Sequence, residues 1–208
     1  MGQVPEKQKS GSRLALIGDG RLATHWRHYC AAEGISFVAW SRREDGDSVE
    51  SFAQKIQDAD RVWLMVRDDA IESILERFES ALEGRAVFHA SGAHVSTRAQ
   101  GIHPLSSFGA GLFYPLGEYR SIALMGEISE FDFRARFPEF QNPYYFLSPE
   151  LKPLYHAWCV IAGNFTTALW STFFSRLETE FDLPRSVALP YLARISEKLK
   201  QDGMRALT

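Results

Sequence analysis

The sequence predicts an α/β fold: a doubly wound, largely parallel sheet followed by a short helical region. Three observations predict it. The apolar run Leu14–Ile17 is followed by two glycines and then by an amphipathic stretch, which is a strand–turn–helix pattern. Strand-like and helix-like segments alternate after it. The predicted strand over 62–66 is nearly all apolar, as interior strands of parallel sheets are.

The first predicted strand leads into a turn of the form Gly-x-Gly-x-x-Ala. Gly18 permits a tight turn, Gly20 lets a phosphate approach the backbone without a Cβ in the way, and Ala23 lets the helix pack on the strand. The first N–H groups of a helix carry partial positive charge and suit an anion. An ordinary glycine-rich turn would show the same pattern. We expect the pyrophosphate of a dinucleotide to be bound by Gly18, Asp19, Gly20, Arg21 and Leu22, with Val66 also in the cofactor site.

The residues after the second predicted strand, 35–40, indicate which dinucleotide is preferred. Enzymes that select NAD usually place an acid here for the ribose 2′-hydroxyl. This chain has Ser41, Arg42 and Arg43 instead, with no acid before Glu44. A serine can donate a hydrogen bond and an arginine can pair with a 2′-phosphate through its planar fork. The sequence therefore favours NADP, unless the two arginines are only solvated residues at a strand end.

The remaining elements follow from hydrophobic spacing and turn residues. Apolar residues at three- and four-residue steps end at Gly34 and mark the first helix, whose His25 and His28 we expect at the surface or at its boundary. Asp69, with Glu72 three residues later, has the pattern of a capping box for a helix over 69–80. Further helices are predicted over 47–58, 131–140, 148–181 and 184–200, and further strands over 86–89, 121–125 and 143–147.

Polar side chains gather where two later strands end. Ser91 follows the strand over 86–89, and His103 follows a second short apolar run, with a proline after it. Ligands of doubly wound sheets bind at the carboxyl ends of the strands. A histidine there can donate a proton or anchor a substrate, although a core histidine bonded to the backbone is an equally good interpretation.

The predicted helix over 148–181 carries further candidates. His156 and Asn164 lie on one of its faces, together with Gly163, whose lack of a side chain suggests close backbone approach. His156 could act as an acid and Asn164 could bond the nicotinamide or the substrate. A plain helix crossing is the alternative. Because this helix is apolar around much of its circumference, we expect a partner subunit to cover it in a homodimer.

Several motifs in one order resemble a bacterial family that joins a Rossmann-like domain to a C-terminal helical domain of unknown function. They are the glycine turn, Val-Arg-Asp-Asp-Ala-Ile, His-Ala-Ser-Gly-Ala, His-Pro-Leu-Ser-Ser-Phe, Leu-Tyr-His-Ala and Gly-Asn-Phe. The family is similar in plan to pyrroline-carboxylate reductase and the 6-phosphogluconate dehydrogenase-like enzymes. The resemblance covers about residues 13–208. It implies an NADP-dependent oxidoreductase whose helical domain dimerises and helps to close the active site.

The chain departs from that pattern in two places. Related hydroxyacid dehydrogenases carry a catalytic lysine four residues before an asparagine, whereas Val160 stands four before Asn164 here. Lys152 lies at the helix entry and could not take that place. The sequence also ends at Thr208, so the helical domain is shorter than the family's; a natural short form and a trimmed chain are equally compatible with this end.

Composition bounds the remaining possibilities. A net charge of −3 without a basic stripe argues against nucleic acid, and no stretch is long enough to cross a membrane. Two cysteines far apart, without a Cys-x-x-Cys pair, indicate buried thiols in a reducing compartment and no structural metal site. The cytoplasm is therefore expected. We divide the chain into a disordered leader (1–12), a Rossmann-like domain (13–147) and a helical dimerisation and substrate region (148–208).

Two functional hypotheses result from the sequence. In the first, the chain is an NADP-dependent oxidoreductase acting on a small carbonyl, imine or hydroxy compound. Ser91 and His103 would then orient the substrate, while His156 or Asn164 handles the proton or the carbonyl oxygen. In the second, the chain is a non-catalytic NADP-binding or scaffold protein, which the missing lysine and the short end favour.

Overall fold

A computed structural model describes residues 13–206, and the predicted leader over 1–12 lies outside them. The chain forms two compact units, of which one ends at Ala157 and the other begins at Trp158. The first holds the sheet and most of the candidate residues. The second is helical.

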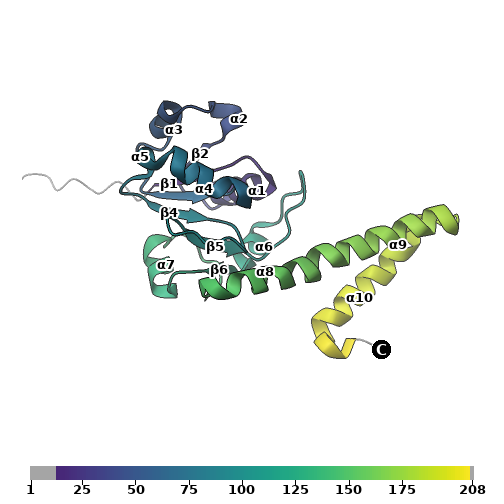
Figure 1. Cartoon of the computed structure of the whole chain (residues 1–208). Helices are drawn as coiled ribbons and strands as arrows, with labels where there is room; N and C mark the ends of the chain where they lie inside the picture. Colours follow the sequence, from purple (N-terminus) through teal and green to yellow (C-terminus); the bar gives the residue numbers. More distant parts are fainter. Residues whose placement is uncertain (1–12, 207–208) are drawn as a thin grey trace, which may run out of the picture. The chain divides into compact units, whose positions relative to one another are not determined.

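The first unit contains one seven-stranded sheet in the order β2-β1-β3-β4-β5-β6-β7 (Figure 1). Strands β1 to β5 pair in parallel, β6 runs antiparallel to β5, and β7 is parallel to β6. From β1 the chain moves outward to β2 and then returns to β3 on the other side of β1. The α/β, doubly wound prediction is confirmed. The strands are β1 Leu14–Ile17, β2 Phe37–Trp40, β3 Arg61–Leu64, β4 Ala86–His89, β5 Gln100–Pro104, β6 Leu124–Gly126 and β7 Tyr144–Phe146.

Helices cover both faces of this sheet (Figure 1). Because side chains alternate along a strand, Leu14 and Leu16 of β1 join the core beneath α1, whereas Ala15 and Ile17 join the core beneath α3 and α4. Burying one large apolar side chain contributes about 1.5–3 kcal/mol to the stability of the fold. The two cores therefore hold the helices on both faces of the sheet. One face is covered by α1 Arg21–Ala32, α6 Leu116–Ser121 and α7 Glu130–Arg136, and the other by α3 Val49–Lys55, α4 Asp68–Arg77 and α5 Glu79–Leu82.

Three local predictions were wrong. The stretch 121–125 is not a single strand, because α6 ends at Ser121 and the amide of buried Asn142 donates to two carbonyl groups, of Tyr119 and Ile122, at the turn before β6. Asp69 does not cap α4, which begins one residue earlier and has Arg67 at its N-cap. His25 is buried, since its ring bonds the Tyr119 hydroxyl and the Gly109 carbonyl.

The C-terminal helices agree with the predicted segments. A 3₁₀ turn, α8 (Lys152–Val160), a π-helical segment (Ile161–Phe165) and α9 (Thr166–Glu180) follow one another without a break. A 3₁₀ turn then leads into α10 (Leu189–Asp202), where Tyr191 packs against Trp170 of α9 at 5.9 Å between ring centroids. No helix among residues 13–206 is long and apolar enough to cross a membrane.

Candidate functional site

The glycine turn is held between the ends of two strands. Gly18 has φ +132°, and a Cβ added to it would overlap the carbonyl oxygen of Met65, which follows β3. On the other side, the N–H of Gly18 donates to the Trp40 carbonyl at 2.9 Å, at the end of β2. Val66 also borders the turn, with Cγ1 3.4 Å from the Cβ position of Gly18. The turn therefore occupies the point where the strand order reverses, which is where doubly wound sheets bind ligands.

The start of α1 is open. Gly20 occupies the N-cap with no side-chain hydrogen bond, and the first turn contains no acid. In contrast, serine hydroxyls cap three other helices. A Cβ at Gly20 would meet no described atom within 4 Å. Exposed Arg21 and partly buried Leu22 form the first turn. These features fit the pyrophosphate of a dinucleotide, which needs free N–H groups and close access to the backbone.

The end of β2 presents arginines beside this turn. Arg43 forms a 3.2 Å ion pair with Asp19, and its side chain is 83% exposed. Arg42 is also exposed. Buried Ser41 has a structural role, because its hydroxyl caps the short helix α2 (Arg42–Asp45) by accepting from the Glu44 N–H at 3.2 Å. The Ser-x-x-Glu spacing of 41–44 is a capping pattern that could have revealed this role from the sequence.

A second cluster forms beyond β4 and β5. His103 lies near the end of β5, and its Nδ1 is 3.1 Å from the Tyr155 hydroxyl of α8. The rings of His103 and His156 lie 5.6 Å apart and nearly perpendicular. Gly92 passes so close to His156 that a Cβ at that position would overlap the imidazole. The structure thus brings His103, His156 and the loop after β4 together.

Ser91 shapes that loop. Its hydroxyl accepts from the N–H groups of Ala93 at 3.2 Å and His94 at 2.9 Å, and its side chain is buried. Asn164 lies in the π-helical segment of the second unit. Gly163, in the same segment, has no described atom within 4 Å of a Cβ position, so the predicted close approach is not made within the described chain.

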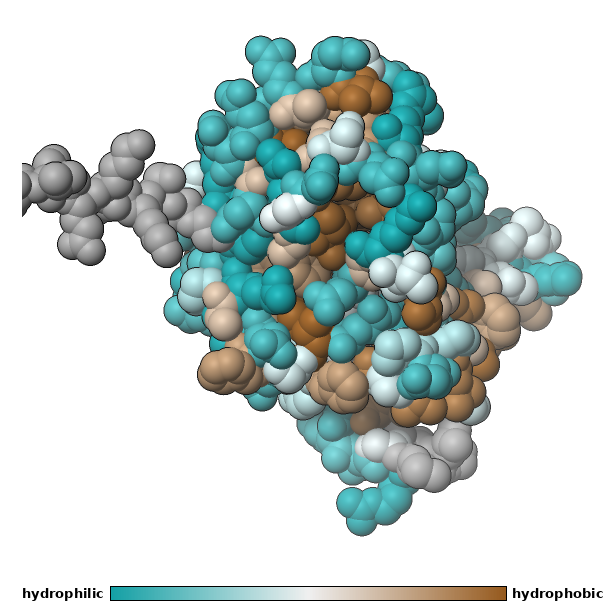
Figure 2. Space-filling model, turned by 60° about the vertical axis from the view of Figure 1, so that its left-hand side comes forward, coloured by the Kyte–Doolittle hydropathy of each residue, from teal (hydrophilic) through white to brown (hydrophobic). Residues whose placement is uncertain are grey.

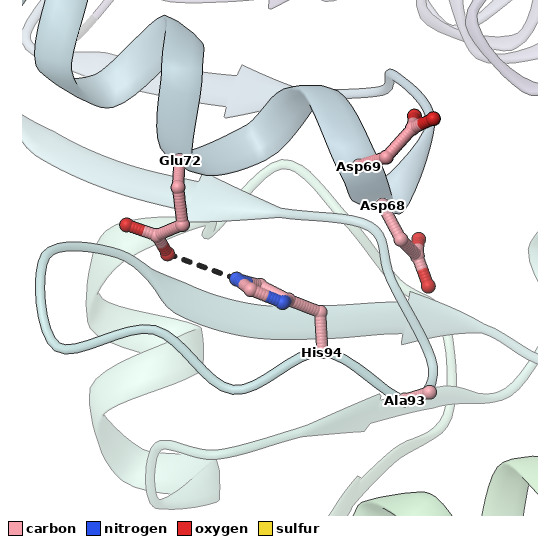
Figure 3. Close-up of a pocket in the computed structure, with 5 residues that line it drawn as sticks. All are labelled: Asp68, Asp69, Glu72, Ala93 and His94. Atoms are coloured by element: carbon pink, nitrogen blue, oxygen red, sulfur yellow. Dashed lines mark hydrogen bonds and ion pairs between the residues drawn. The ribbon is translucent and has the colours of Figure 1, made fainter.

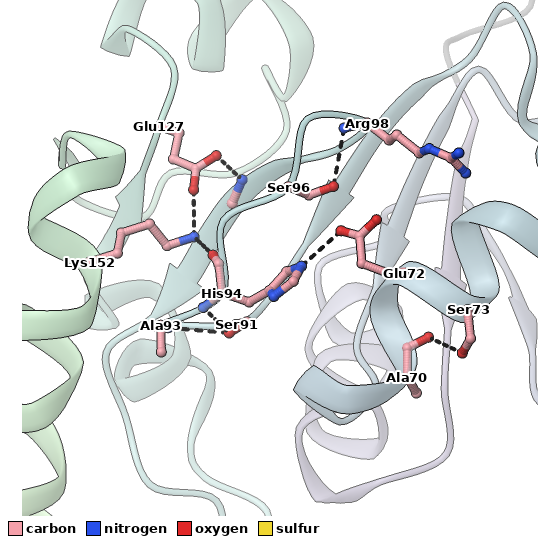
Figure 4. A network of polar contacts seen from close by, with 11 residues as sticks. Ala70, Glu72, Ser73, Ser91, Ala93, His94, Ser96, Arg98, Glu127 and Lys152 are labelled. Atoms are coloured by element: carbon pink, nitrogen blue, oxygen red, sulfur yellow. Dashed lines mark hydrogen bonds and ion pairs between the residues drawn. The ribbon is translucent and has the colours of Figure 1, made fainter.

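A buried ion pair that the sequence did not predict lies next to this cluster (Figure 4). The Lys152 ammonium group donates to Glu127 and to the His94 carbonyl, each at 2.5 Å, and Lys152 is 2% exposed. The other Glu127 oxygen accepts from the Gly101 N–H at 2.7 Å. The network ties α8 to the loop after β4 and to the start of β5. Lys152 is therefore a buried structural residue, although the sequence shows only a lysine beside a proline.

An acidic hollow of about 460 Å³ lies between the start of α4 and the loop after β4 (Figure 3). His94 bridges to Glu72 across it, with Nε2 2.9 Å from the carboxylate, and this hydrogen bond lowers the pKa of Glu72. The hollow is lined by Asp68, Asp69, Glu72, Ala93 and His94.

Two histidines of this region are held neutral. His89 is fully buried at the end of β4, and neither ring nitrogen has a hydrogen-bond partner among the described residues. Burial lowers its pKa to about 3, with the charges of Lys152 and His94 adding to the effect. Burial also lowers the pKa of His103 to about 4, and the charge of His156 contributes. Near pH 7 both rings can serve only as neutral donors or acceptors.

These pKa values predict acid sensitivity. Below about pH 6.5 a histidine of the unfolded chain binds a proton, whereas His89 and His103 of the folded chain stay neutral. Their contribution to the free energy of unfolding is therefore fully present above that pH and is lost as the pH falls toward 4 and then 3. His89→Leu should raise the free energy of unfolding by about 1–3 kcal/mol at pH 7, because it removes a buried unpaired imidazole. It should also flatten the decline between pH 6.5 and 4. Urea unfolding at several pH values measures both, and an unchanged pH slope would contradict the assignment.

The fold belongs to a known structural class. No protein-family model matches this sequence, and no curated protein matches it in sequence. Among solved structures, a Bacteroides fragilis protein provisionally assigned as an NADP oxidoreductase is 21% identical, with TM-score 0.74 over 95% of this chain and 84% of that one. A Thermotoga maritima protein is 22% identical, with TM-score 0.67 over 94% and 82%.

A more distant structure is pyrroline carboxylate reductase of Plasmodium falciparum with NADP bound. It is 10% identical, with TM-score 0.64 over 93% of this chain and 80% of that chain. At these identities the likeness establishes the fold: a Rossmann-like sheet followed by a helical part. The resemblance predicted from the motifs is therefore confirmed at the level of fold.

Proposed function

We propose that the chain binds NADP and transfers a hydride between it and a small carbonyl, imine or hydroxy compound. The observation that carries the proposal is the open start of α1 at the point where the strand order reverses, with Gly20 at its N-cap. When bound, the cofactor supplies the hydride chemistry. Solved structures of the same fold include NADP-bound pyrroline carboxylate reductase, which supports this choice.

In this proposal the described residues divide into two groups. The pyrophosphate lies on the N–H groups at the start of α1, and Arg42 with Arg43 binds the 2′-phosphate; for this, Arg43 exchanges the Asp19 carboxylate for the phosphate. Ser91 and His103 orient the substrate at the carboxyl edge of the sheet. His156 or Asn164 then handles the proton or the carbonyl oxygen.

A non-catalytic NADP-binding protein is the second candidate. It is favoured by Val160 at the position where related dehydrogenases have a catalytic lysine, and by the engagement of Lys152 with Glu127. Incubation of the chain with NADPH and each member of a panel of keto acids and imines, followed by the loss of NADPH absorbance, separates the enzyme from the non-catalytic binding protein. Turnover supports the enzyme, whereas NADPH binding with no turnover supports the binder.

Gly20→Ala tests the cofactor site. The backbone at Gly20 has φ −71° and its surroundings are open, so the free energy of unfolding should change by no more than about 1 kcal/mol. A methyl group between the phosphates and the helix should nevertheless weaken NADP binding at least tenfold in calorimetry. The wild-type chain should bind NADP more tightly than NAD. Equal NADP affinity in the variant, or no binding of either nucleotide to the wild type, would overturn the proposal.

We also propose that the second unit forms a homodimer. Among its described hydrophobic residues only Leu177 and Ala188 are buried, while Trp158 is 62% and Leu169 is 72% exposed. The exposure of these side chains favours a partner subunit. Figure 2 shows one face of the molecule, on which hydrophilic residues predominate and hydrophobic residues lie between them. Light scattering at micromolar concentration should give twice the chain mass of 23.6 kDa, and a stable monomer would contradict this.

A further inference from the structure

The hydroxyl group of Tyr155 is the hydrogen-bond partner of His103. The two side chains come from α8 and β5, far apart in sequence, and the Nδ1-to-hydroxyl distance is 3.1 Å. The rings meet edge to face at 5.7 Å between centroids. This bond is made by the imidazole ring of His103, whereas its backbone lies in the pairing of β5 with β6.

A neutral imidazole carries its proton on one nitrogen only, and the bond made by the other nitrogen selects which. Because burial keeps the pKa of His103 near 4, the ring is neutral at pH 7. A phenol is the stronger donor and an imidazole nitrogen the stronger acceptor. The favoured pairing therefore has the Tyr155 O–H donating to Nδ1, which leaves the proton on Nε2.

From this geometry we propose that Tyr155 is a positioning residue that holds His103 as the Nε2–H tautomer, so that His103 can only donate a hydrogen bond. Its role toward a substrate rests on the proposed function. There, a donor-only imidazole binds the oxygen of a carbonyl or the nitrogen of an imine. Tyr155 thereby favours substrates in which the carbon that receives the hydride is doubly bonded to an acceptor atom.

The buried contacts of α8 support this role. Lys152 lies three residues before Tyr155 and one helical turn before His156, so the three side chains lie on neighbouring parts of one helix face. The ion pair of Lys152 with Glu127 fixes that turn of the helix against the sheet. Tyr155 is therefore presented to His103 from a rigid element.

The test uses the full chain without ligand, so it does not depend on the proposed function. Long-range ¹H–¹⁵N NMR spectra at pH 7 distinguish protonated from unprotonated ring nitrogens, and His103→Gln identifies the His103 signals. In the wild type we expect Nε2 protonated and Nδ1 unprotonated. Tyr155→Phe should shift the population toward the Nδ1–H form. Tyr145→Phe, which changes an exposed tyrosine on β7, should leave it unchanged.

A wild-type spectrum with the proton on Nδ1 would overturn the proposal, even if Tyr155→Phe failed to fold. An unchanged tautomer in a folded Tyr155→Phe variant would also overturn it. Where the panel of keto acids and imines identifies a substrate, Tyr155→Phe should lower kcat/KM about tenfold or more, since the donor is misplaced, with the Kd for NADP unchanged.

Discussion

Replacing Glu127 by alanine is expected to lower the free energy of unfolding by about 3–5 kcal/mol, because it leaves the Lys152 ammonium group buried without its counter-charge. After the change, Lys152 keeps only the His94 carbonyl, and the Gly101 N–H loses its acceptor. Urea unfolding followed by tryptophan fluorescence at pH 7 measures the loss.

Two controls separate the buried pair from charge in general. Asp58→Ala, which removes the exposed partner of Arg13, should change the stability by less than about 1 kcal/mol. The double change Glu127→Leu with Lys152→Met should recover most of the loss, since an apolar pair of similar size needs no counter-charge. A small effect of Glu127→Ala, or a double variant no better than Glu127→Ala alone, would show that the pair is not held as described.

Gly18→Ala should have the second large effect: it should lower the free energy of unfolding by about 3 kcal/mol or more and abolish NADP binding. Its φ of +132° is unfavourable for alanine, and the added methyl group would overlap the Met65 carbonyl oxygen, which belongs to rigid backbone. The comparison with Gly20→Ala is informative because the glycines lie two residues apart. Gly18→Ala should lower both the melting temperature and the affinity for NADP, whereas Gly20→Ala should lower only the affinity for NADP. Equal melting temperatures for the two variants would refute this division of roles.

The fold was predictable because its signals are local. Leu14–Ile17, the glycines after it and the spacing of Trp26 and Tyr29 each depend on a few neighbouring residues, and the structure has the strand, turn and helix where they indicate them. Where the strand predicted over 121–125 begins was not a local property, because the turn before β6 is held by Asn142, which lies about 20 residues further along the chain.

The candidate site was predictable only in part. Strand ends pointed to Ser91 and His103, and the structure places His156 beside His103. The pairing of Lys152 with Glu127 could not be predicted, because lysine and glutamate are residue types that usually lie on the solvated surface. Nor could burial of His25, which depends on a loop that folds back onto α1 through Gly109.

The two glycines beneath α8 have an evolutionary consequence. Gly101 lacks a side chain where the Lys152 ammonium group lies, and Gly92 where the His156 ring lies. The Glu127 carboxylate lies only 2.8 Å from the Cβ position of Gly101, so that position is released from glycine only when residues 152 and 127 both become shorter, whereas a shorter residue at 156 would release position 92. Across natural variants, position 101 should therefore change together with 152 and 127, and 92 with 156, although these positions are widely separated in the sequence.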